Sequence, residues 1–160
     1  MIVHSAQTPH NGDTMNVFTD AQIKRLASLD VSGQGGKDAE IAEALGHNRV
    51  SARYFDATTD AGDSIEYKKQ SSTQWFDLIK LAELSDKQGD IEILWFMHTK
   101  GAIHTVHSCT YAELIEHLEL SRLQLRVVRL FSKVCKSLKP QVKIPLKKKF
   151  ISTLPIVWEK

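Results

Sequence analysis

The chain has 160 residues and a formal net charge of +2, with 42% hydrophobic and 25% charged residues. This size suits one compact domain, and the apolar runs are too short for a bilayer span or a signal peptide, so we expect no membrane partner. Cys109 and Cys135 lack Cys-x-x-Cys spacing, which favours two buried thiols in a reducing cytoplasm over a disulfide framework or a zinc ribbon.

The N-terminal residues predict an extension followed by one domain. Residues 1–15 are polar and show no hydrophobic period, so we expect them to be flexible. We expect residues 16–160 to form a single domain that contains all the functional elements. Residues 33–37 hint at a phosphate loop, but Asp38 stands where that motif needs Ser or Thr, so a tight turn is favoured.

Two helices are expected at the start of this domain. Thr19 or Asp20 can cap a helix that continues to about Leu29. The next helix is expected over residues 37–45, because Gly46 can end it in the left-handed conformation. This helix resembles the first half of a helix-turn-helix, so a DNA-binding regulator without catalysis is one alternative function.

A strand, a turn and a second strand are expected next. The strands are predicted over residues 53–56 and 65–70, and residues 60–63 supply turn chemistry between them. Side chains alternate along a strand, so Glu66 and Lys68 are expected to share one face.

The middle of the chain predicts a helix, a strand pair and another helix. A helix is expected over residues 75–89, followed by an apolar strand over 91–98 and its partner over 102–107. Thr110 is expected to begin a helix, because Glu113 stands three residues later and can complete a capping box.

The C-terminal residues predict one more helix and one edge strand. The helix is expected over residues 122–138, and the strand over 142–151 is placed at an edge because Pro145 cannot donate to a ladder. Together these elements predict an α/β fold with a mixed central β-sheet flanked by helices.

Asp56, Glu66 and Lys68 form the candidate catalytic set. A hairpin folded back at Gly62 would bring Asp56 opposite Glu66, and paired carboxylates suit one or two Mg²⁺ ions. A neighbouring ammonium group can orient or deprotonate a metal-bound water and stabilise developing negative charge, which is the chemistry of phosphodiester hydrolysis. The alternative is a solvated acidic hairpin that contains Glu-x-Lys by chance.

The same residues resemble a known family. Asp56, a turn with Ala-Gly, and Glu66-x-Lys68 after a ten-residue gap are similar to the motif of the PD-(D/E)XK nuclease superfamily, above all its type II restriction endonucleases. Further stretches that match in the same order are residues 35–37, 95–101 and 143–147. The resemblance therefore spans roughly residues 33–150.

The resemblance implies a restriction-endonuclease-like fold and a division of roles. Asp56 and Glu66 would bind Mg²⁺, the backbone carbonyl of Tyr67 would complete the coordination, and Lys68 would position or activate water. It also implies a companion DNA methyltransferase.

Basic and polar residues outside this set are expected to bind DNA. Residues 121–160 carry eleven Lys and Arg against the single Glu159, which suits a polyanion, although such a tail can also be a solvated face. Residues 70–74 follow the catalytic strand and can hydrogen-bond to base edges, although the same run can also cap a helix. The expected DNA-binding residues are Gln34, Lys37, Lys69, Gln70, Ser71, Ser72, Thr73, Gln74, Lys147, Lys148 and Lys149.

We therefore expect a Mg²⁺-dependent DNA endonuclease, of type II, that cuts a short palindromic site in double-stranded DNA. A homodimer is expected, because one such site cuts one strand and two-fold symmetry matches a palindrome. A junction resolvase or a homing endonuclease with the same core is the alternative among enzymes.

Overall fold

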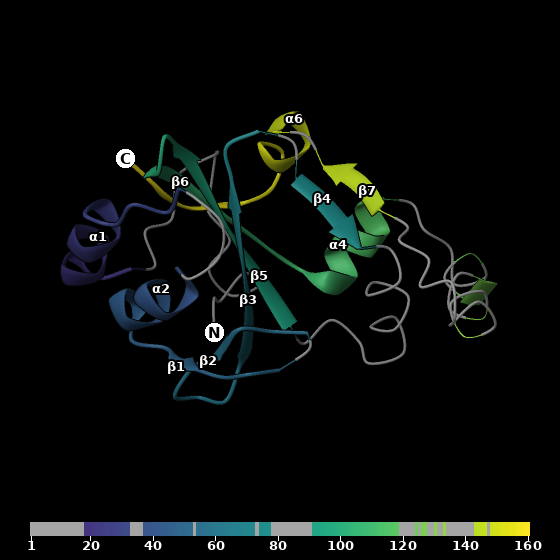
Figure 1. Ribbon diagram of the computed structural model, residues 1–160, viewed down its shortest axis with the longest axis horizontal. Helices are drawn as coiled ribbons and strands as arrows, with labels where there is room; N and C mark the ends of the chain where they lie inside the picture. Colours follow the sequence, from purple (N-terminus) through teal and green to yellow (C-terminus); the bar gives the residue numbers. More distant parts are fainter. Residues whose placement is uncertain are drawn as a thin grey trace.

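The computed structural model describes residues 18–32, 37–52, 54–72, 74–77, 91–118, 143–146 and 148–160, together with positions 124, 126, 127, 130 and 133. These residues form a mixed α/β fold with a six-stranded, mostly antiparallel open sheet and a separate two-stranded sheet (Figure 1). The described part of the chain contains no helix with the length and apolar character needed to cross a membrane.

The strands of the main sheet are β1 (Asn48–Arg49), β2 (Ala57–Thr58), β3 (Ser64–Gln70), β5 (Ile91–Thr99), β6 (Ala102–Thr110) and β8 (Ile156–Glu159). They lie in the order β1-β2-β3-β5-β6-β8. β3 and β5 run parallel, and every other neighbouring pair runs antiparallel. The second sheet pairs β4 (Gln74–Asp77) with β7 (Lys143–Leu146).

The helices are α1 (Asp20–Ala27), α2 (Asp38–Leu45), α4 (Tyr111–His117) and the four-residue α6 (Lys148–Ile151). The start of α1 at Thr19 and the start of α4 at Thr110 are confirmed, and each has a complete capping box. Gly46 ends α2 with φ of 72°, as its position in the sequence predicted.

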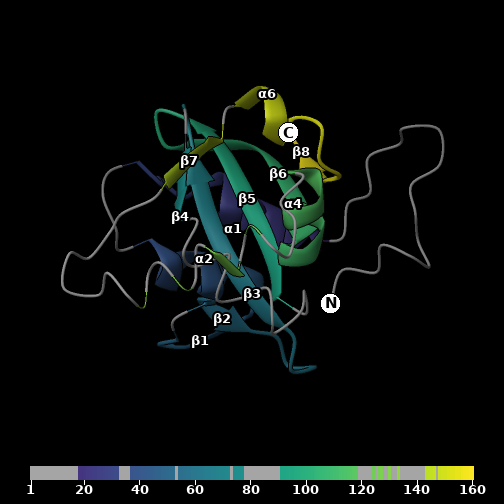
Figure 2. The same ribbon diagram turned by 90° about the vertical axis from the view of Figure 1, so that its right-hand side faces the viewer.

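The core lies on both faces of the main sheet. Leu94 and Phe96 of β5 pack toward α1 and α2, whereas Ile93, Trp95 and Met97 pack toward α4 and α6. Figure 2 shows α4 in front of the sheet and α1 and α2 behind it. Because helices cover both faces, β5 reads as one continuous apolar run, which is why the sequence identified it.

Some expected elements are wrong. Asp56 lies in a bend just before β2, so no strand ends there, and the helix expected to begin at Trp75 begins as strand β4. The strand expected over 142–151 stops at Leu146 and is followed by α6. Aromatic residues suit strands as well as helices, and the partner that selects the strand, β7, lies far away in the sequence.

Two further strands, β1 and β8, were not expected from the sequence. β1 follows α2 directly, so the residues after Gly46 form a strand where a helix-turn-helix would need its recognition helix. β8 adds to the edge of β6. Three expectations lie outside the described residues: the extension over 1–15, most of the helix over 122–138, and the burial of Cys135. Cys109 is described, and it is buried and free, as expected.

Candidate active site and adjoining basic pocket

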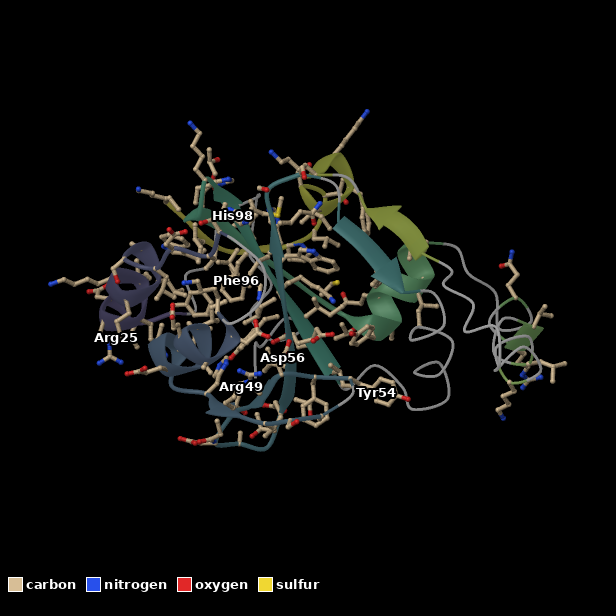
Figure 3. The ribbon with its side chains drawn as sticks, viewed as in Figure 1. Arg25, Arg49, Tyr54, Asp56, Phe96 and His98 are labelled. Atoms are coloured by element: carbon tan, nitrogen blue, oxygen red, sulfur yellow. The ribbon has the colours of Figure 1, made fainter. Side chains whose placement is uncertain are left out.

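The β2–β3 hairpin brings Asp56 opposite Glu66, which confirms the expected arrangement. Ala57 pairs with Ile65 in the ladder, and the turn closes at Gly62, whose φ of 92° favours glycine. The Asp56 N–H donates to the Ile65 carbonyl at 2.8 Å, while Asp56 Oδ2 accepts from the Tyr67 N–H at 2.8 Å. Figure 3 shows Asp56 beside β3.

Glu66 is a buried carboxylate with two further contacts. Only 4% of its surface is exposed. The Tyr111 hydroxyl donates to Glu66 Oε2 at 2.8 Å, and Lys68 Nζ lies 3.7 Å from the same oxygen. Since Glu66 and Lys68 are two residues apart on β3, they share one face of the strand, as expected. We call Asp56, Glu66, Lys68 and Tyr111 the carboxylate site.

Sequence reasoning missed Tyr111. This residue is the first of α4 and lies 45 positions from Glu66, so no local spacing links the two. The capping box at Thr110 signalled where the helix begins but not what its first side chain contacts. Burial and the charge of Glu66 raise the pKa of Tyr111, which keeps its hydroxyl protonated and therefore a donor.

The two carboxyl groups interact strongly. Burial, then a hydrogen bond with Glu66 and the negative charge of Glu66, together raise the pKa of Asp56 to about 7. The N–H of Tyr67 opposes the shift by stabilising the charged form. The two carboxyl groups therefore share a proton near neutral pH, and a bound cation could replace that proton.

The donor set fits Mg²⁺. Asp56 and Glu66 supply hard oxygen ligands, which Mg²⁺ prefers, and Mg²⁺ commonly binds through one or two carboxylates while it keeps several waters. Within the described residues no three His, Cys, Asp or Glu side chains gather as a metal site. The Tyr67 side chain faces the opposite side of the sheet, where its hydroxyl lies 2.7 Å from His47 Nδ1, so only its backbone could serve this site.

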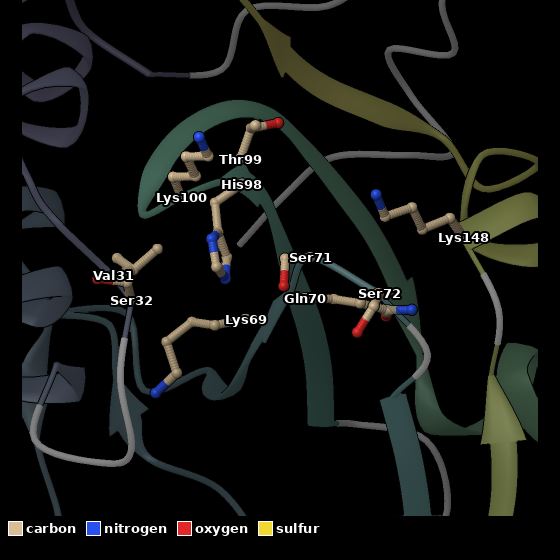
Figure 4. A pocket seen from close by; sticks show the side chains of 10 residues that line it. All are labelled: Val31, Ser32, Lys69, Gln70, Ser71, Ser72, His98, Thr99, Lys100 and Lys148. Carbon is tan, nitrogen blue, oxygen red and sulfur yellow. The ribbon is translucent and has the colours of Figure 1, made fainter.

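A basic pocket of about 540 Å³ adjoins the carboxylate site at the carboxyl ends of β3 and β5 (Figure 4). It is lined by Val31, Ser32, Lys69, Gln70, Ser71, Ser72, His98, Thr99, Lys100 and Lys148. Gln70 belongs to the same face of β3 as Glu66 and Lys68, so the pocket continues that face toward the end of the strand.

The structure brings some of the expected DNA-binding residues together and separates others. Five of them line the basic pocket: Lys69, Gln70, Ser71, Ser72 and Lys148. Lys37 lies instead beside Glu40 at 3.8 Å, and Lys149 is exposed on α6 outside the pocket lining. Gln34, Thr73 and Lys147 lie outside the described residues, and of Gln74 only its place at the start of β4 is described.

Sequence reasoning missed the other five pocket residues as binding residues. Val31 and Ser32 come from the loop after α1, and His98, Thr99 and Lys100 come from the end of β5 and the turn that follows it. The signal for these last three was the apolar strand that ends at a turn, because residues at the carboxyl ends of parallel strands commonly form ligand sites.

No protein-family model matches this chain, and no curated protein matches it significantly.

Proposed function

We propose that this protein is a Mg²⁺-dependent endonuclease that hydrolyses phosphodiester bonds in double-stranded DNA. One observation carries the proposal: Asp56 and Glu66 are hydrogen-bonded carboxyl groups on a tight hairpin, with the Lys68 ammonium group 3.7 Å from Glu66. Two carboxylates and an ammonium group, in contact and partly shielded from water, are the groups that this hydrolysis requires.

Each residue of the carboxylate site has a role in the proposed reaction. Asp56 and Glu66 would hold the metal, with the Tyr67 carbonyl as a further ligand. Bound Mg²⁺ would polarise a phosphodiester oxygen and lower the pKa of a bound water. Lys68 would position or deprotonate that water and stabilise the charge that develops on the phosphate. Tyr111 would act as a positioning residue, because its hydroxyl fixes one oxygen of Glu66.

The finer proposal is a type II restriction endonuclease with a restriction-endonuclease-like fold. The resemblance of Asp56, Glu66 and Lys68 to the PD-(D/E)XK motif supports it, and so does a mixed sheet that carries Glu66 and Lys68 on its central strand β3. Such an enzyme would act as a homodimer on a palindrome and would be accompanied by a DNA methyltransferase.

Cleavage of plasmid DNA tests this function. With Mg²⁺ the purified protein should produce discrete fragments, and a chelator should stop the reaction. Asp56→Asn and Glu66→Gln should each lower the rate about 100-fold or more, because each removes a charged ligand while keeping the shape of the side chain. Asp60→Asn is the matched control, since Asp60 is exposed in the hairpin turn, where it accepts a hydrogen bond from Asn48.

Two results would overturn the proposal. The first is no cleavage of any DNA with Mg²⁺, and the second is full activity in both carboxylate variants. Cleavage that follows branched structure, with no fixed sequence, would replace the restriction enzyme by a junction resolvase with the same chemistry.

A further inference from the structure

The basic pocket has the charge and the donors of an anion site. None of the described residues that line it is acidic, whereas Lys69, Lys100 and Lys148 supply three ammonium groups. Lys69 is partly neutralised by Asp38 at 2.6 Å. In the described part of the chain, Lys100 and Lys148 form no ion pair, so their charge remains available to a ligand.

His98 adds a directed donor to the pocket. The Gly101 N–H donates to His98 Nδ1 at 3.0 Å, so a neutral ring carries its proton on Nε2. Burial, followed by the charge of His104, lowers the pKa of His98, which favours this neutral form at physiological pH. Figure 4 shows His98 near the end of β5 and Ser71 just after the end of β3, with Lys148 reaching toward them from the other side.

The backbone holds these groups in place. Lys100 and Gly101 form the two-residue turn between β5 and β6, both with positive φ, and a side chain added at Gly101 would overlap the Asp30 carboxylate. Ser71 and Ser72 follow β3 directly and are exposed, so their hydroxyl groups can donate to a ligand. Ammonium, hydroxyl and imidazole donors at one opening suit the several oxygens of a phosphate group.

The pocket is also in line with the carboxylate site. Glu66, Lys68 and Gln70 lie on one face of β3, and four residues of strand span about 13 Å. One DNA strand rises about 3.4 Å per phosphate, so a strand that lies across Glu66 would present another phosphate at the pocket a few nucleotides away.

We propose that the basic pocket is a phosphate-binding site that holds a backbone phosphate of the DNA strand a few nucleotides from the bond that is cut. The choice of DNA as the source of the phosphate rests on the proposed function. The same donors could instead hold a small molecule that carries phosphate, and the experiment separates these two sources.

The first arm measures phosphate alone. Inorganic phosphate is titrated into the protein while the imidazole signals of His98 are followed by NMR. The signals should shift in the wild type and in Lys149→Ala, and the shift should be weakened several-fold in Lys148→Ala and in Lys100→Ala. Lys148 and Lys149 are adjacent, exposed lysines of α6, and only Lys148 lines the pocket, so their comparison separates the pocket from general surface charge.

The second arm measures DNA. The Glu66→Gln protein, which should not cut, is titrated with a duplex at several salt concentrations. Adding Lys148→Ala should weaken binding and reduce the slope of log affinity against log salt by about one, as expected for one lost phosphate contact.

Each outcome decides the inference. No shift of His98 with phosphate in the wild type overturns the site itself. A shift that depends on Lys148, combined with unchanged DNA affinity and slope, overturns DNA as the source and assigns the pocket to a small phosphate compound. Phosphate binding in a protein that cuts no DNA would reject only the proposed nuclease function, because this first arm does not depend on cleavage.

Discussion

Strand β3 carries two sites of opposite character. The carboxylate site is largely buried, and hydrogen bonds from Tyr67 and Tyr111 fix its acidic groups. The basic pocket at the end of the same strand is open, and two of its three lysines are exposed. Buried, fixed groups suit chemistry at one bond, whereas exposed flexible lysines suit attraction of a charged chain. Substitutions in the carboxylate site should therefore lower mainly the cleavage rate, and substitutions in the basic pocket should lower mainly the affinity for DNA.

The sharpest test of this comparison is the pair Lys68 and Lys69. These neighbours point to opposite faces of β3, Lys68 toward Glu66 and Lys69 toward Asp38 of α2. Lys68→Met should reduce the cleavage rate about 100-fold or more with DNA affinity nearly unchanged. Lys69→Met should weaken DNA binding modestly and leave the rate at saturating DNA intact. Single-turnover cleavage and equilibrium binding measure the two effects, and equal losses in both variants would erase the distinction.

Tyr111→Phe should give the next largest effect. The change removes the hydroxyl that donates to Glu66 but keeps the buried ring. Loss of a group that orients a metal ligand commonly lowers metal affinity 10–100-fold, so the Mg²⁺ concentration needed for half-maximal cleavage should rise by about this factor. Tyr67→Phe is the matched control, because its hydroxyl faces His47 on the other side of the sheet and its removal should leave the Mg²⁺ requirement unchanged.

The stability of the metal-free protein should depend on pH through Asp56. Its pKa rises from an ordinary value of 3.8 to about 7 in the fold, so between these values the folded state binds more protons than the unfolded state. The free energy of unfolding should therefore fall as pH rises from about 4 to about 7. Asp56→Asn should flatten this part of the profile and stabilise the protein at pH above 7, as measured by urea unfolding. An unchanged profile in the variant would assign the titration to another group.

The stabilisation that Mg²⁺ gives the protein should increase as pH rises, whereas the stability of the metal-free protein should fall. It competes with the shared proton, so its stabilising effect should be larger at about pH 8 than at about pH 6.

The smallest predicted effect concerns the helix cap next to Tyr111. Thr110→Ala removes the side chain that caps α4 and should lower the free energy of unfolding by about 1 kcal/mol. Thr19→Ala removes the same kind of cap from α1 and should cost a similar amount. Only Thr110→Ala should also raise the Mg²⁺ requirement slightly, because α4 positions Tyr111. Denaturant unfolding and Mg²⁺ titration of cleavage compare the two variants.

Local signals in the sequence predicted the parts of the fold that local interactions determine. The capping boxes at Thr19 and Thr110 gave the starts of two helices, and the apolar run before Lys100 and Gly101 gave the β5–β6 hairpin. The contact between Asp56 and Glu66 was also predictable, since a single hairpin joins them.

The elements and contacts that the sequence did not predict depend on residues far apart in the chain. β4 is a strand because it pairs with β7, about 70 residues later in the chain, and β8 completes an edge that β6 leaves open. The approach of Tyr111 to Glu66 depends on how α4 docks on the sheet, and the basic pocket depends on four separate segments meeting. Neither arrangement leaves a periodic signal in the sequence.

Glu66 has one partner that is near in the sequence, Asp56, and one that is distant, Tyr111, and this difference affects the order in which the contacts form during folding. Asp56 and Glu66 are joined by a short hairpin, whereas Tyr111 lies 45 positions from Glu66. Closing a short loop costs less entropy, so we expect the two carboxyl groups to meet before α4 arrives. A substitution in the turn at Gly62 should then slow folding, whereas Tyr111→Phe should mainly speed unfolding. The acidic pair would in that case exist early in the folding reaction as a small proton- or cation-holding hairpin, completed by its hydroxyl partner only in the last steps.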